Sequence, residues 1–283
     1  MLTELQIREY REKGWTVAPA LVDQRKVSDL LSEMTYICAE NTLETHDKTR
    51  MEMEPDQPPQ GSAVRRLYEP CTHYTAFDAF SRSDRILDCV QSLIGPDILR
   101  HYSKINMKPA RVGSVVEWHQ DLTYYPLTNG DSLALLLYLD DANIENGCLK
   151  LIPGKHNQDL MDHTSEGFFQ GRVTSPVDEN AAEAIEGSAG TAIFMHAMTP
   201  HSSVPNKTNK PRRTLIISYR SADSYPIFTG PETADIESLV ELVRGKRKLN
   251  ARITFSSFPI PVHEKKAASL YELQEQSRAK KER

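Results

Sequence analysis

The chain has 283 residues, of which 39% are hydrophobic and 26% are charged, and its formal net charge is −5. It is long enough for a full hydrophobic core, and it has neither an apolar run of about 18 residues nor a dominant basic cluster, so neither a membrane nor a nucleic acid is an expected partner. The four cysteines show no CxxC spacing, which disfavours a thiolate metal site and a disulfide framework and favours a cytoplasmic location.

The first part of the chain, to about residue 97, is predicted to be mainly helical. Residues 3–6 have the spacing of a capping box, so a short helix is expected there, followed by a strand at 15–18. Apolar residues recur with helical spacing over 27–39, and a helix pair is expected over 74–93. Residues 41–64 are polar and contain three prolines, which indicates a long loop, and we expect this loop to cover a site.

The pattern changes at about residue 98 to short apolar runs separated by turn residues such as Asn129-Gly130 and Asn146-Gly147. The expected strands cover residues 98–107, 132–139, 148–152, 191–195 and 214–219. Such spacing is typical of an antiparallel sandwich or jelly roll. After about residue 220 the composition becomes helical again over 233–247 and 264–281. We therefore expect one domain over residues 1–283, with a β core at about 98–220 between a helical N-terminal and a helical C-terminal part.

Three residues have the character of a metal site. His119 and Asp121 are two positions apart at the predicted exit of a strand, so their side chains point to the same side. A second histidine, His201, follows the predicted strand at 191–195. Two histidines and one carboxylate form a facial triad that leaves coordination positions open, as non-haem iron(II) oxygenases require. Zinc accepts the same ligands, so the residues alone leave the metal open.

Arg212 lies eleven residues after His201, at the start of an apolar predicted strand. A buried guanidinium is costly unless it is paired with an anion, and a carboxylate matches its planar fork. The distal carboxylate of 2-oxoglutarate fits this role. The neighbouring Arg213 is expected to face the opposite side of the strand.

The sequence around these residues resembles the phytanoyl-CoA dioxygenase family in three ordered motifs. The first is 118–126 (WHQDLTYYP). The second is NGCL at 146–149, followed by PGKH at 153–156, in which Lys155 replaces the usual serine. The third is His201-x-Ser203-x-x-Asn206, followed by Pro-Arg-Arg at 211–213. A weaker likeness extends upstream, so the resemblance covers most of the chain up to about residue 219.

The resemblance implies a double-stranded β-helix (jelly roll, cupin-like) with flanking helices, and an iron(II) that works with 2-oxoglutarate and dioxygen. Its metal ligands match His119, Asp121 and His201. Its 2-oxoglutarate contacts match Arg212 and Ser203. The remaining implied contacts with 2-oxoglutarate are Lys104 and Leu137, of which Leu137 stands where the family often has tryptophan. For the substrate pocket we expect Trp118, Tyr124, Arg66 and Asn106.

We therefore expect an iron(II)- and 2-oxoglutarate-dependent dioxygenase that hydroxylates a C–H bond of a small-molecule metabolite and releases succinate and CO2. Desaturation, epimerisation or cyclisation by the same cofactors is an alternative outcome. A cupin-type metal enzyme that does not use 2-oxoglutarate and a non-catalytic sheet protein are the alternatives from other classes. His156 and His196 are expected to be structural, and no oligomeric state is assigned.

Overall fold

The computed structural model describes residues 1–111, 115–227, 237–264 and 270–281. Its α-helices are α1 (Glu4–Lys13), α2 (Gln24–Cys38), α3 (Pro70–His73), α4 (Thr75–Ser81), α5 (Asp84–Ile94) and α6 (Leu270–Lys281). Its strands are β1 (Trp15–Ala18), β2 (Met51–Met53), β3 (Val64–Tyr68), β4 (Ile98–Lys108), β5 (Val116–His119), β6 (Ser132–Tyr138), β7 (Leu149–Leu151), β8 (Thr164–Ser165), β9 (Phe168–Phe169), β10 (Glu183–Ile185), β11 (Ala192–His196), β12 (His201–Ser203), β13 (Arg212–Ser221) and β14 (Glu241–Arg244). None of the helices in these ranges combines the length and the apolar character that a membrane span requires.

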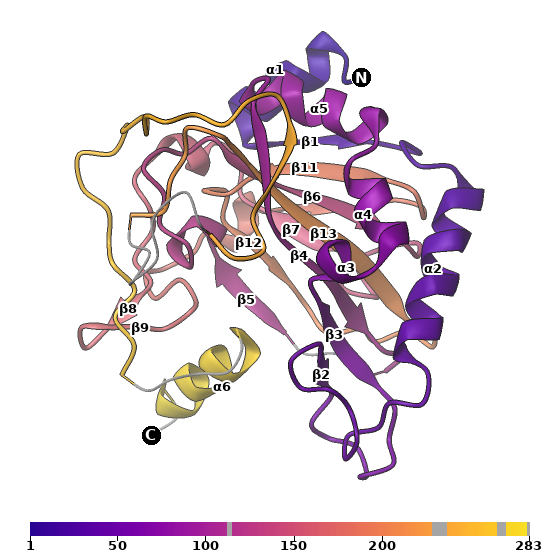
Figure 1. Cartoon of the computed structure of the whole chain (residues 1–283). Coiled ribbons are helices and arrows are strands. Elements are labelled where there is room, and N and C mark those ends of the chain that lie inside the picture. Colours follow the sequence, from indigo (N-terminus) through magenta and orange to yellow (C-terminus); the bar gives the residue numbers. More distant parts are fainter. Residues whose placement is uncertain (112–114, 228–236, 265–269, 282–283) are drawn as a thin grey trace.

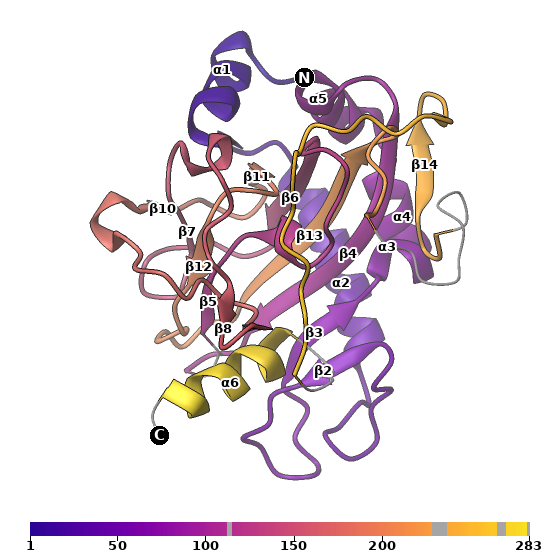
Figure 2. The same cartoon turned by 90° about the vertical axis from the view of Figure 1, so that its left-hand side faces the viewer.

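Two sheets form the centre of the structure. The larger has the order β1-β11-β6-β13-β4-β3-β2, with β14 paired to β4, and the smaller has the order β10-β7-β12-β5. Both are antiparallel in every pairing. Helices α2 to α5 cover one face of the larger sheet, and the smaller sheet lies on the other side (Figures 1 and 2).

Strand β6 lies in a part of the larger sheet that is covered on both faces, since all seven of its residues are buried. Leu135 and Leu137 belong to the apolar cluster under the helices, together with residues of α2 and α5. Leu136 and Tyr138 belong to a second cluster, which fills the space between the two sheets. Adjacent strand residues point to opposite faces, so a continuous apolar run is what a strand between two apolar layers requires.

Most of the predicted elements are confirmed. The capping box at Thr3 begins α1, the helix pair over 74–93 is α4 and α5, and each of the five strands expected between 98 and 219 is present. The expected loop over 41–64 contains β2, which extends the larger sheet by pairing with β3. Met51 and Met53 of β2 are buried, so this segment is partly core.

The helix expected over 233–247 is wrong from residue 237 onward, and residues 233–236 lie outside the described ranges. This segment contains β14, which pairs with β4 of the larger sheet. Arg244 of β14 also forms ion pairs with Asp84 and Asp88 of α5, both at 2.7 Å. Residues 98–100 of β4 extend beyond its pairing with β3, and pairing with them outweighs the weak local helical preference of this segment. In the C-terminal part after residue 220, α6 is the one α-helix among the described residues. Of the helix expected over 264–281, residue 264 is not helical, residues 265–269 lie outside the described ranges, and residues 270–281 form α6.

Candidate active site

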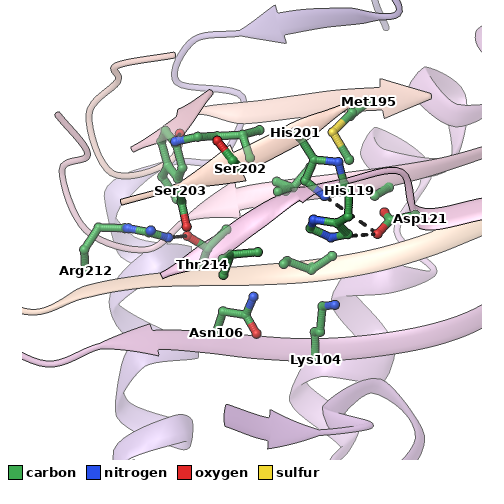
Figure 3. Close-up of a pocket in the computed structure, with 16 residues that line it drawn as sticks. Lys104, Asn106, His119, Asp121, Met195, His201, Ser202, Ser203, Arg212 and Thr214 are labelled. Atoms are coloured by element: carbon green, nitrogen blue, oxygen red, sulfur yellow. Dashed lines mark hydrogen bonds and ion pairs between the residues drawn. The ribbon is translucent and has the colours of Figure 1, made fainter. Parts of the chain in front are cut away.

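The three expected metal ligands converge. Strands β5 and β12 place His119 directly opposite His201, with ring centroids 4.0 Å apart, and Asp121 follows in the short 3-10 helix η1 (Asp121–Thr123). Asp121 Oδ1 lies 3.6 Å from His119 Nε2 and 3.7 Å from His201 Nε2. Figure 3 shows the three side chains pointing toward one another. This group of residues could hold one metal ion.

Backbone carbonyls fix the orientation of both imidazoles. His119 Nδ1 lies 2.8 Å from the carbonyl oxygen of Glu117, and His201 Nδ1 lies 3.0 Å from that of Thr199. Each Nδ1 must carry the proton and donate it, which leaves the lone pair of each Nε2 free to face the other ligands. Burial lowers the pKa of both histidines, so both rings are neutral and ready to bind a metal near pH 7.

Gln120, between the two ligands of the motif, has a structural role that the sequence analysis missed. Its side chain is fully buried, accepts a hydrogen bond from the backbone N–H of Met161 at 2.8 Å, and donates one to the carbonyl of Met198. Its backbone N–H donates to His163 Nε2 at 3.2 Å. These bonds hold the turn that carries His119 and Asp121. The glutamine between two expected metal ligands was the available sequence signal for Gln120, whereas nothing in the sequence indicated His163.

A small cavity of about 50 Å³ extends from the metal ligands between the two sheets (Figure 3). The smaller sheet contributes Ser203 to its wall, and the larger sheet contributes Lys104, Asn106 and Arg212. Burial, followed by the nearby charge of Arg66, lowers the pKa of Lys104 to about 8. We call this space the inner cavity. Its wall is partly apolar, and the positive charges of Lys104 and Arg212 suit a small anion.

Arg212 is buried in the wall of the inner cavity without a carboxylate partner in the described residues. Its Nη1 donates to Thr214 Oγ1 at 2.9 Å and its Nη2 donates to the carbonyl of Gly147, while its Nε has no hydrogen-bond partner among the residues that the structure describes. Gly147 has a φ of 77°, and a Cβ there would lie 2.1 Å from the carbonyl oxygen of Val204. Glycine is therefore required in a turn that also orients Arg212. Arg213 points away, as expected, and pairs with Asp140 at 2.6 Å.

A larger cavity of about 310 Å³ opens on the other side of the metal ligands, and we call it the outer cavity. It shares four lining residues with the inner cavity: Lys104, His119, Asp121 and Ile216. Its remaining lining residues are Arg66, Tyr68, Tyr102, Tyr124, Tyr125 and Ser218. The expected pocket residues Arg66 and Tyr124 thus lie here, and Asn106 lies in the inner cavity. The two cavities meet at His119 and Asp121.

Two expected residues lie elsewhere. Leu137 packs in the cluster under the helices, and its neighbour Leu136 lines the inner cavity instead. Trp118 lines neither cavity, because it neighbours His119 in a strand and the two side chains point to opposite faces. Both corrections follow from strand alternation, in which a shift of one residue moves a side chain to the other side of the sheet.

Comparison with known proteins identifies the protein family of this chain. The family described as Phytanoyl-CoA dioxygenase (PhyH) matches residues 10–214. The chain belongs to the phytanoyl-CoA dioxygenase family. Among its relatives, the "Probable alpha-ketoglutarate-dependent hypophosphite dioxygenase" of Stutzerimonas stutzeri is 31% identical over 263 residues, which cover 90% of this chain and 91% of the relative. The methylphosphonate hydroxylase of Gimesia maris is 25% identical over 220 residues, which cover 78% of this chain and 81% of that relative.

The fold of this family member also matches solved structures. The crystal structure of EctD from S. alaskensis with 2-oxoglutarate and 5-hydroxyectoine aligns with a TM-score of 0.66 at 20% identity, covering 83% of this chain and 87% of that one. This likeness confirms the cupin-like jelly roll. The family and the site together make this chain a non-haem dioxygenase that depends on iron(II) and 2-oxoglutarate.

The residues present fit these cofactors. Two neutral imidazoles and a carboxylate are a suitable donor set for iron(II) with positions left open. The buried Arg212, whose Nε has no hydrogen-bond partner among the described residues, lines the same cavity as His119, Asp121 and His201. Without such an anion its charge is poorly compensated, and burial lowers its pKa.

Proposed function

We propose that His119, Asp121 and His201 bind the iron and that the inner cavity holds 2-oxoglutarate. In this arrangement Arg212 and Ser203 bind the distal carboxylate, and Lys104 contributes a second positive charge. The support is the position of these polar groups along one narrow cavity that begins at the metal ligands. Arg212 is held in place before the co-substrate arrives, so little conformational entropy is lost when it binds.

The reaction that we propose is R–H + 2-oxoglutarate + O2 → R–OH + succinate + CO2. The bound iron and 2-oxoglutarate supply the oxidising chemistry, and this chain's residues supply geometry and the exclusion of water. The carbonyls of Glu117 and Thr199 hold the Nδ1 protons of both histidines. The tyrosines of the outer cavity enclose the substrate beside Asp121 and His119. Desaturation, epimerisation or cyclisation would use the same site with a substrate that reacts differently.

We propose that the substrate is a small phosphorus oxyanion, such as a phosphinate or a phosphonate. One observation carries this proposal: two cationic side chains, Arg66 and Lys104, line the outer cavity, and its one acidic lining residue, Asp121, is a metal ligand in the arrangement above. The cavity volume of about 310 Å³ is at the lower end for small-molecule sites, which fits a small substrate better than an acyl-CoA. The names of the two relatives, one acting on hypophosphite and one on methylphosphonate, point the same way.

The test is a substrate panel with the purified enzyme, iron(II) and 2-oxoglutarate. Succinate and the oxidised product are measured with hypophosphite, methylphosphonate, L-proline and ectoine, the last two being substrates named for other relatives. We expect product from a phosphorus compound and none from His201→Ala. Coupled turnover of proline or ectoine, with none of either phosphorus compound, would overturn the proposed substrate class.

We also propose a cytoplasmic location. All four cysteines are free thiols, and three of them are buried: Cys71, Cys89 and Cys148. Unpaired cysteines are usual in a reducing compartment. Fractionation of the native cells, followed by immunodetection, tests this location.

A further inference from the structure

Five arginines are buried in the described part of the chain: Arg65, Arg66, Arg100, Arg212 and Arg220. Three of them pair with a carboxylate of the protein: Arg65 with Glu54 at 3.3 Å, Arg100 with Asp78 at 2.7 Å, and Arg220 with Glu237. Arg212 has no such partner, and the proposed function assigns its anion to 2-oxoglutarate. Among the described residues, Arg66 is the remaining buried arginine, and no carboxylate lies closer to it than 3.9 Å.

The guanidinium of Arg66 is held in place but not neutralised. Its Nε donates to Asn106 Oδ1 at 3.0 Å, and its Nη2 has no hydrogen-bond partner among the described residues. The nearest carboxylate oxygen, Glu52 Oε2, is 3.9 Å from Nη1 and already accepts a hydrogen bond from the Tyr68 hydroxyl at 2.8 Å. The rings of Tyr68 and Tyr271 lie 5.6 and 4.7 Å from the guanidinium carbon.

The charge of Arg66 persists although the side chain is buried. Burial acts to lower its pKa, but the electrostatic influence of four nearby groups is larger than that of burial and raises the pKa overall. These groups are Tyr102, Tyr271, Tyr68 and Glu52. A permanently charged fork with an unused N–H is costly in a buried site unless an anion completes it. Arg66 lines the outer cavity together with His119 and Asp121, so an anion bound to it lies in the same cavity as the metal ligands.

We propose that Arg66 binds the oxyanion of the substrate, a role that rests on the proposed function of the outer cavity. Two oxygens of a phosphonate or phosphinate match the planar fork of a guanidinium, and the group to be oxidised then faces the metal site. Asn106 and Tyr271 fix the plane of the fork. Tyr271 belongs to α6, so a helix far away in sequence helps to position the substrate.

The experiment measures binding separately from turnover. Isothermal titration calorimetry under anaerobic conditions, with iron(II) and 2-oxoglutarate present, determines the Kd of methylphosphonate and of inorganic phosphate. The enzymes compared are the wild type, Arg66→Gln, Arg66→Lys and the matched control Arg213→Gln, whose arginine pairs with Asp140 outside the cavities. Thermal unfolding confirms that each variant is folded.

We expect Arg66→Gln to raise the Kd of methylphosphonate about 30-fold, equal to about 2 kcal/mol. Arg66→Lys keeps the charge but loses the fork, so a smaller increase is expected, and this variant serves if Arg66→Gln does not fold. Both Arg66 variants should keep the Kd of 2-oxoglutarate within about threefold, a difference below 1 kcal/mol. Arg213→Gln should change neither Kd.

Three results separate this inference from the proposed function. Equal methylphosphonate affinity in the wild type and in both Arg66 variants overturns the inference, even if the wild type oxidises methylphosphonate. A loss of 2-oxoglutarate affinity as large as the loss of methylphosphonate affinity also overturns it, because Arg66 would then belong to the co-substrate. Binding of phosphate or methylphosphonate that depends on Arg66, in an enzyme that oxidises no phosphorus compound, supports the anion site and refutes the proposed substrate class.

Discussion

Replacing Arg212 by glutamine should weaken 2-oxoglutarate binding strongly while the protein stays folded. Arg212 is 5% exposed, and its hydrogen bonds to Thr214 and Gly147 leave Nε without a partner in the described part of the chain. A charge-assisted pair with a carboxylate in such a buried position contributes about 2–4 kcal/mol. The expected increase in the KM for 2-oxoglutarate is therefore about 30- to 1000-fold. Glutamine fills much of the same space, so a large cavity is avoided.

The assay is succinate release at varied 2-oxoglutarate concentrations, with calorimetric titration of 2-oxoglutarate as a second measurement. The matched control is Arg213→Gln. Arg213 is adjacent in β13, but its side chain points outward to Asp140, so its loss should change the KM less than about threefold, or 0.7 kcal/mol. Equal effects of the two substitutions, or a larger effect at Arg213, would refute the assignment of Arg212 to the inner cavity.

Three further changes have defined outcomes. His201→Ala should abolish stoichiometric iron binding, measured by metal analysis, and turnover, with an unchanged circular dichroism spectrum. Gln120→Leu should lower the free energy of unfolding of the iron-free protein by about 2–5 kcal/mol in urea, because it leaves polar groups of Met161 and Met198 buried without partners. The pKa of Lys104 is lowered to about 8, so kcat/KM for 2-oxoglutarate should fall as pH rises through about 8, and Lys104→Met should remove this inflection.

Each of these outcomes has a contrary result. Wild-type iron content in His201→Ala would remove this residue from the metal site. A change below about 0.5 kcal/mol in Gln120→Leu would show that its hydrogen bonds do not hold the turn. An inflection near pH 8 that persists in Lys104→Met would assign the titration to another group.

Local patterns were sufficient for the elements whose partners are near in sequence or whose periodicity is strong. The capping box at Thr3 and the apolar spacing over 27–39 predicted α1 and α2, because the signals lie within the helices themselves. Strand β14 could not be predicted in this way. Its conformation depends on residues 98–100 of β4, about 140 residues earlier, with which β3 does not pair, and on acidic residues of α5.

The residues of the site also divide into those that local motifs predicted and those that depend on distant parts of the chain. The triad was predictable because His119 and Asp121 share a short motif and His201 lies in a second one. The face of β6 that meets the cavity was not predictable, because residues 133–137 are apolar without a break, and Leu136 lines the cavity instead of Leu137. The contribution of α6 was also hidden, since Tyr271 reaches Arg66 from about 200 residues away.

The two ends of the inner cavity belong to different sheets, and this division has a consequence for diacid selectivity. The proposed metal ligands come from the smaller sheet and its connecting turn, whereas Arg212 comes from β13 of the larger sheet. In the arrangement proposed above, the distance between the two sheets would therefore limit the length of the carbon chain between the two carboxylates of a 2-oxo diacid. Leu136 and Ile216 help to set that spacing, although neither has a polar group. Discrimination against the shorter oxaloacetate or the longer 2-oxoadipate is then a property of interlayer packing, and an apolar substitution at Leu136 can change it while every polar contact residue stays in place.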